Sequence, residues 1–87
     1  MRIRIVWTKE DINHIRKHNI EPIEIESIFE SRIYYRRGGD FYDFLGRTRT
    51  GRILFVILER LGQDTYRVVM ARDATDSEKN LYVRRAK

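Results

Sequence analysis

The sequence contains no cysteine, which excludes a disulfide framework, a zinc site built on thiolates and a cysteine nucleophile. It also lacks a long apolar run, since the longest, 53–58, is far shorter than the roughly 20 residues that span a bilayer. The N-terminal residues 1–5 alternate charged and apolar side chains, unlike the apolar core of a signal peptide. We therefore expect a cytoplasmic protein that does not enter a membrane.

Proline and glycine are scarce, with one proline and five glycines among 87 residues. No proline- or serine-rich linker, internal repeat or low-complexity segment divides the chain. Hydrophobic residues make up 41% of the sequence, enough to form a core despite 36% charged residues. The sequence therefore predicts a single domain over residues 1–87.

Acidic residues are fewer than basic ones: 18 Lys and Arg against 13 Asp and Glu give a net charge of +5. The excess lies in the second part, because residues 1–31 sum to −1 and residues 32–87 to +6. Arginine supplies 14 of the cations, and its planar guanidinium matches phosphate oxygens and stacks on bases. This composition favours a polyanionic partner, with nucleic acid first, although a solvated basic surface explains it equally well.

Capping residues and apolar periodicity predict three helices. The first follows Thr8, whose hydroxyl caps it with Asp11 at capping-box spacing, and it ends at 18–19, where Asn tolerates the left-handed conformation. Pro22 fits the first turn of the second helix. A full capping-box pattern at 75–78 starts the third.

Alternating β-branched and aromatic side chains predict five strands. They cover residues 2–7, 33–37, 41–48, 53–60 and 66–71. Gly46 marks a bulge or a close approach of another segment, and the run after position 52 is apolar on both faces, as in a central strand. The order β-α-α-β-β-β-β-α predicts an α+β fold: an antiparallel sheet with the helices packed mainly on one face.

The two histidines, His14 and His18, share one helical face. Their spacing can bind a metal, but no Glu completes the H-E-x-x-H pattern and no third ligand is evident, so we expect neither a metal site nor a cofactor. His18 is a candidate general acid or base. The alternative is a histidine that is stabilised by the dipole at the helix C-terminus.

The arginines of the predicted meander are the strongest binding candidates. Arg47 and Arg49 have the same parity on one strand and so project from the same face. Three more flank the neighbouring strands: Arg52, Arg60 and Arg72. In an antiparallel sheet these guanidiniums can converge to hold a phosphodiester and stabilise its transition state. The alternative is a solvated basic face without chemistry.

Aromatic residues interleave with Arg36, Arg37 and Arg47. They are Tyr34, Tyr35, Phe41, Tyr42 and Phe44. Such mixtures suit stacking on single-stranded bases, whereas the alternative is a sheet made of residues with high β-propensity.

Four segments of the chain form a recognisable set. They are Trp7, Lys17-His18 with Ile20, Gly46-Arg47-Thr48 with Gly51-Arg52, and Ala71-Arg72-x-Ala74-Thr75-x-x-Glu78-x-x-x-Tyr82. Together they resemble the BrnT family of type II toxins, small ribonucleases whose fold is related to the RelE toxins. The chain departs from that family in having His14 where Asn is usual and Asn19 where Gly is usual.

The resemblance implies a RelE-like fold and the toxin component of a type II toxin–antitoxin system. Such a toxin is a metal-independent endoribonuclease that cleaves RNA, inhibits translation and growth, and is neutralised by a BrnA-like antitoxin. It contacts operator DNA only through the antitoxin complex.

The resemblance also implies catalytic roles for the residues that match. These are Lys17, His18, Arg52, Arg72, Glu78 and Tyr82. Arg47, Arg52 and Arg72 hold the phosphate, His18 or Glu78 serves as base, and Lys17, His18 or Tyr82 serves as acid. The alternatives are that Glu78 is only a capping-box residue and that Arg72 is structural. Arginines also form the expected RNA-binding set: Arg36, Arg37, Arg47, Arg49 and Arg60.

Two other functions stay open. A non-catalytic module can grip nucleic acid or an antitoxin through the same arginines, and it predicts salt-sensitive RNA binding without cleavage. A partner-binding domain whose toxicity has been lost, through changes such as the one at position 14, predicts antitoxin binding without an effect on growth.

Overall fold

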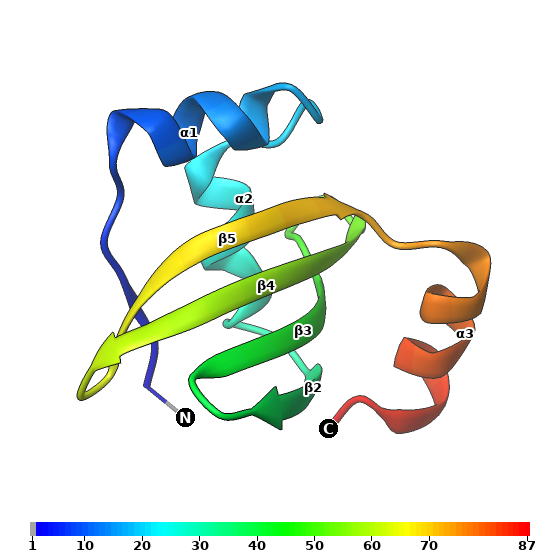
Figure 1. The fold of residues 1–87 in the computed structure, drawn as a ribbon. Helices are drawn as coiled ribbons and strands as arrows, with labels where there is room; N and C mark the ends of the chain where they lie inside the picture. The colour runs from blue at the N-terminus through cyan, green and yellow to red at the C-terminus, as the bar shows by residue number, and fades with distance from the viewer. Residues whose placement is uncertain (1) are drawn as a thin grey trace.

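The structure is a computed structural model that describes residues 2–87. Its elements are β1 (Arg4–Ile5), α1 (Lys9–Arg16), α2 (Pro22–Ile28), β2 (Ile33–Gly38), β3 (Phe41–Arg47), β4 (Ile53–Gly62), β5 (Thr65–Asp73) and α3 (Asp76–Arg85) (Figure 1). This order confirms the predicted α+β fold. No helix in the described residues is long and apolar enough to cross a membrane.

The five strands form one sheet in the order β1-β5-β4-β3-β2, which confirms β4 as the central strand. Strands β2 to β5 form the predicted antiparallel meander, but β1 runs parallel to β5, so the sheet is mixed. No hairpin links β1 to its neighbour, because α1 and α2 carry the chain from one sheet edge to the other. The first strand is also shorter than the predicted 2–7, since only Arg4 and Ile5 pair with β5.

The two faces of the sheet carry separate apolar clusters. Helices α1 and α2 cover one face, where Ile15 and Ile28 pack on buried strand residues such as Phe44 and Val56. Helix α3 packs on the opposite face, as Figure 1 shows at the right of the sheet, and its Tyr82 joins a second cluster. Strand β4 is covered by helices on both faces of the sheet because it directs apolar side chains to each face.

The helix caps follow the sequence closely, with one exception. Thr8 accepts a hydrogen bond from the Asp11 amide as predicted, but the expected reciprocal bond of a capping box is not made. The Asp11 carboxylate instead bonds to Arg67 of β5 at 2.9 Å, because burial of this carboxylate favours a charged partner over a neutral amide. An unpredicted capping box joins Glu21 and Glu24 at the start of α2.

Gly46 confirms the predicted close approach between two elements. A Cβ at this position would lie 2.7 Å from the Cβ of Ile28 in α2, which is closer than two such atoms can approach. Both residues are buried, so neither can move aside without disturbing the core. The absence of a side chain at Gly46 of β3 is therefore what lets α2 pack directly on the sheet.

We predict that Gly46→Ala lowers the free energy of unfolding by about 1–3 kcal/mol, the usual effect of overpacking a core. Urea unfolding measures this change. The matched control is Gly38→Ala, also in a strand, where no atom lies within 4 Å of the added Cβ. Equal stability of the two variants would contradict the close packing of α2 on β3.

Candidate functional site

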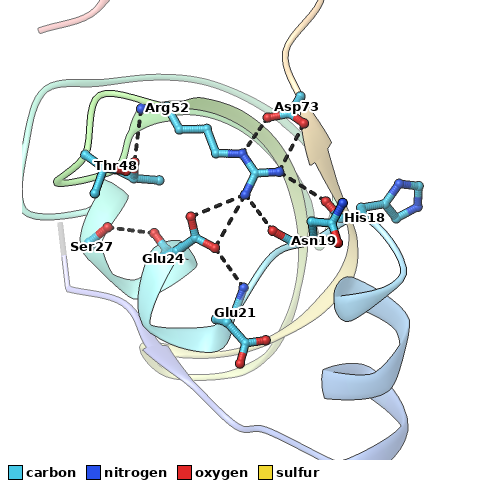
Figure 2. A network of polar contacts seen from close by, with 9 residues as sticks. His18, Asn19, Glu21, Glu24, Ser27, Thr48, Arg52 and Asp73 are labelled. Carbon is cyan, nitrogen blue, oxygen red and sulfur yellow. Dashed lines mark hydrogen bonds and ion pairs between the residues drawn. The ribbon is translucent and has the colours of Figure 1, made fainter.

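The guanidinium of Arg52, directly before β4, connects four parts of the fold (Figure 2). It donates to both carboxylate oxygens of Asp73 at 2.6 and 3.0 Å. It also donates to the backbone carbonyl oxygens of Asn19 at 2.7 Å and His18 at 3.1 Å. A longer contact of 3.3 Å reaches Glu24 of α2. With 24% of its side chain exposed, Arg52 is largely withdrawn from solvent.

The local sequence explains why carbonyl groups face Arg52. Helix α1 ends at Arg16, and Asn19 adopts the predicted left-handed conformation with a φ of 58°. The chain turns away at this point, so the carbonyls of His18 and Asn19 have no helical partner and accept from the guanidinium instead. The Thr48 hydroxyl accepts from the Arg52 amide at 3.1 Å and fixes its backbone.

The charges around Asp73 favour its ionised form. The pKa of this carboxyl lies below its ordinary value, first because it accepts hydrogen bonds from Arg52. Burial opposes the shift, and the charges of Lys79 and His18 add to it. Asp73 is therefore held in its ionised form, with the side chains of Lys79 and His18 nearby.

A second ion pair occupies the other face of the sheet. Arg72 lies inside β5 rather than after it, because the strand extends beyond the predicted end. Its guanidinium bonds to Glu78 of α3 at 2.8 and 3.1 Å and lies over the Phe55 ring, 4.4 Å from the centroid. The pKa of Glu78 lies below its ordinary value, chiefly because of the hydrogen bonds from Arg72. Glu78 also closes the predicted capping box with Thr75.

The pairing of β5 with β4 explains why the two ion pairs are separate. Arg72 is opposite Phe55 and Asp73 is opposite Leu54, and successive side chains of a strand point to opposite faces. Arg52 therefore meets Asp73 on the α1 and α2 side, and Arg72 meets Glu78 on the α3 side.

Four cationic or titratable side chains near this end of the sheet have free polar groups. Among residues 2–87, the side chains of Lys17, His18, Arg47 and Lys79 make no hydrogen bond or ion pair in the structure. In Figure 2 the His18 imidazole points away from the Arg52 network. Lys79 is not among the residues that the sequence singles out, because nothing in its sequence context distinguishes it from other charged residues. Its place in the first turns of α3, beside Asp73, depends on the fold.

Tyr82 belongs to the packing of α3 rather than to the free groups. It is 2% exposed, and its hydroxyl donates to the Arg32 carbonyl at 2.8 Å. Arg47 lies over its ring, with 6.0 Å between the guanidinium carbon and the centroid.

The predicted convergence of arginines occurs only in part. Arg47, Arg52 and Arg72 lie at the same end of the sheet, whereas Arg60 lies at the opposite end of β4, about 26 Å away at the usual rise per residue. Arg49 is in the loop after β3, not on the strand, and it bonds to Glu30 at 2.7 and 2.9 Å.

Arg36 and Arg37 are also distant from that end. They face Asp43 and Tyr42 across the β2–β3 pair, toward the other end of the sheet. Arg37 donates to the Gly39 carbonyl and lies over the Tyr42 ring, and Arg36 has no polar partner among residues 2–87.

We call the residues at the end of β5 the β5-end cluster. They are Lys17, His18, Arg52, Arg72, Asp73, Glu78 and Lys79. Arg52 and Arg72 are held by carboxylates, while the lysines and the imidazole are free to meet a ligand. Such a set can attract a phosphodiester and move a proton. Residues 2–87 contain no group of three or more His, Cys, Asp or Glu side chains arranged for a metal ion.

We predict that Arg52→Ala lowers the free energy of unfolding by about 1–3 kcal/mol, because two carboxylates and two carbonyls lose their donor. Chemical denaturation measures the change. Arg60→Ala serves as the control, because the Arg60 side chain is exposed and makes no hydrogen bond or ion pair among residues 2–87. Substitution of such a side chain usually changes stability by less than about 0.5 kcal/mol. Similar losses in the two variants would contradict a connecting role for Arg52.

We also predict that stability falls as pH decreases from about 6 to 3. The pKa values of Asp73 and Glu78 are lowered in the folded state, so the unfolded chain takes up protons first. Their contribution is complete above the unfolded pKa values and is lost as pH falls through the folded ones. Melting temperatures across this range should fall less steeply for Asp73→Asn with Glu78→Gln, and an identical slope would contradict the assignment.

Comparisons of the sequence with models of known protein families and with curated proteins find no match. A comparison with solved structures finds the crystal structure of the Brucella abortus ribonuclease toxin BrnT, at 19% sequence identity. The match covers 85% of this chain and 99% of that one, with a TM-score of 0.63. A likeness over this much of both chains establishes a common fold. The chain therefore has a BrnT-like toxin fold.

Proposed function

We propose that the chain is the toxin of a type II toxin–antitoxin system and acts as an endoribonuclease. The observation that carries this proposal is a BrnT-like fold in which the unbonded imidazole of His18 and the ammonium of Lys79 both lie close enough to Asp73 to affect its pKa. A ribonuclease needs a proton acceptor and cations at one phosphodiester, and these groups supply both.

The proposed reaction uses the 2′-hydroxyl of RNA as nucleophile and needs no metal. Neutral His18 takes the 2′-hydroxyl proton while the 2′-oxygen bonds to phosphorus and the bond from phosphorus to the 5′-oxygen breaks. Lys17 gives a proton to the departing 5′-oxygen, which leaves a 2′,3′-cyclic phosphate and a 5′-hydroxyl. Lys79 attracts the non-bridging oxygens.

The hydrogen bonds of the structure favour these assignments over the alternatives. Glu78 accepts from Arg72 and from the Thr75 amide, and the hydroxyl of Tyr82 is buried, so neither is as available as His18 and Lys17. Arg52 acts as a positioning residue, because it holds the backbone carbonyl of His18.

We further propose that a BrnA-like antitoxin neutralises the chain in the cytoplasm. The net charge of +5 requires an acidic or apolar covering surface, because removing cations from water needs complementary charge. The arginines predicted to bind RNA lie outside the cluster and remain proposed contacts to RNA: Arg36, Arg37, Arg47, Arg49 and Arg60.

A second candidate function is RNA binding without cleavage. It is favoured by one observation: Arg52 and Arg72 are already bonded to carboxylates, which leaves fewer strong donors for a transition state. This function predicts binding that weakens steeply with salt, while the RNA stays intact.

The test is cleavage of a labelled RNA by the purified chain in EDTA. We predict cleavage by the wild type and a decrease in rate of about 10²–10⁴-fold for His18→Ala, the usual contribution of a general base. His14→Ala is the matched control, because it removes an exposed histidine of α1 that lies four residues before His18, which itself follows the end of the helix. Arg72→Ala is prepared in the same way and tests the second ion pair.

Each outcome separates the candidates. Cleavage that is lost with His18 but kept without His14 supports the ribonuclease and its base. Equal cleavage by all variants indicates a contaminating nuclease or another site. Salt-sensitive binding without cleavage, in EDTA and on ribosomes, overturns the enzyme in favour of the binding module, and inducible expression then should not arrest growth.

A further inference from the structure

Strand β2 forms one edge of the sheet, and its outer side is open over most of its length. We propose that this edge binds an extended, acidic segment of a partner protein as an additional strand. The inference does not depend on ribonuclease activity, because it rests on the backbone groups and charges of β2. Peptide binding tests it without RNA.

The backbone bonds identify which groups are free. Ile33 exchanges two hydrogen bonds with Lys87, at 3.1 and 3.2 Å, so its backbone N–H and C=O point away from β3. In an antiparallel pair this orientation recurs at every second residue, and therefore Tyr35 and Arg37 also point outward. Within residues 2–87, no backbone bond outside the β2–β3 pair reaches either residue. Two donors and two acceptors are thus presented at strand spacing.

The bonds with Lys87 indicate that the edge accepts a strand. This contact covers only the first residue of β2, and the next outward-facing positions continue the same line of backbone groups. An incoming segment can follow Lys87 along the edge and pair with Tyr35 and Arg37. Edge strands with free backbone groups are a common surface for strand addition.

The surroundings of the edge select an acidic partner. A pocket beside it is lined by Phe29, Tyr35 and Arg85 among others, and its lining contains no acidic residue. A second hollow at the other end of the strand is lined by Arg36 and Arg37 and by a single acidic residue, Asp43, so its lining is basic on balance. Because Arg36 and Arg37 point to opposite faces of the sheet, an added segment with alternating acidic and apolar residues brings its carboxylates to one of these guanidinium groups. Its apolar side chains then cover the aromatic ring of Tyr34 or Tyr35 on the other face.

The same charges disfavour two other occupants. A second copy of the chain that paired through β2 would bring Arg36 and Arg37 of both copies together, and like charges across a strand pair are destabilising. RNA can meet the guanidinium groups, but it has no regular series of donors and acceptors to match Tyr35 and Arg37. A protein strand satisfies both the charge and the backbone groups.

The test uses a fluorescein-labelled peptide of alternating valine and glutamate, about ten residues long, to match a strand. Anisotropy with the full chain should show saturable binding, and amide exchange of Tyr35 and Arg37 should slow about tenfold or more when the peptide is present. The peptide N-methylated along its backbone keeps the side chains but cannot pair, so its binding should be lost.

The charge requirement is tested with two double variants of equal net charge. Arg36→Glu with Arg37→Glu should weaken binding of the acidic peptide at least about tenfold. Arg2→Glu with Lys9→Glu changes exposed residues that precede β1, at the opposite edge of the sheet, and start α1, so it should leave binding unchanged apart from a small general effect.

Several results would overturn the proposal. They are equal binding of the N-methylated peptide, no binding up to about 1 mM, and equal weakening by both double variants. Protection of Tyr35 and Arg37 in the protein alone, together with a dimer in sedimentation, would assign the edge to a second copy. Protection of the same amides by a single-stranded RNA that displaces the peptide would assign it to nucleic acid.

Discussion

The hydrogen bonds and ion pairs of one guanidinium, that of Arg52, hold the elements that meet at the end of β5 in place. Arg52 binds Asp73, Glu24 and two carbonyls of the turn after α1, so it fixes a strand, a helix and a turn relative to β4. Its planar set of donors suits this task, because a lysine ammonium could not satisfy carboxylate and carbonyl groups in so many directions. The position of His18 follows from the same bonds.

The basic character of the chain divides into fixed and free charge. Arg52, Arg67 and Arg72 are each paired with carboxylates, and they contribute to structure more than to the field seen by a ligand. The free cations near β5 and along β2 are the groups that a polyanion or an acidic protein would meet. The net charge alone did not distinguish these two groups, since an arginine counts equally whether or not it is paired.

Local signals predicted the elements well. The caps at Thr8 and Thr75, the turn at Asn19 and the central position of β4 depend on neighbouring residues, and the structure has all of them. The parallel pairing of β1 with β5 is set by the path of two helices across the sheet, which no local pattern records.

The site was harder to predict for the same reason. The sequence identified His18, Arg52 and Arg72 as candidates, but the partners of the Arg52 guanidinium lie 21 to 34 positions away along the chain. Glu78, the partner of Arg72, lies only 6 positions away. Asp73 and Lys79 carry no motif of their own, and their relevance depends on the end of β5 meeting the turn after α1. Resemblance to a family indicated the region, and only the fold distinguished the paired groups from the free ones.

The alternation of Arg72 and Asp73 at the end of β5 bears on how faithfully the chain folds. If β5 slipped by one residue against β4 so that Arg72 took the place of Asp73, Arg72 would point to the face where Arg52 lies. Arg52 would then lose its carboxylate partner and meet a like charge, which penalises this misalignment. The ion pair between Arg52 and Asp73 therefore favours the observed register of β5 over this alternative, a selectivity that a purely apolar strand end would lack.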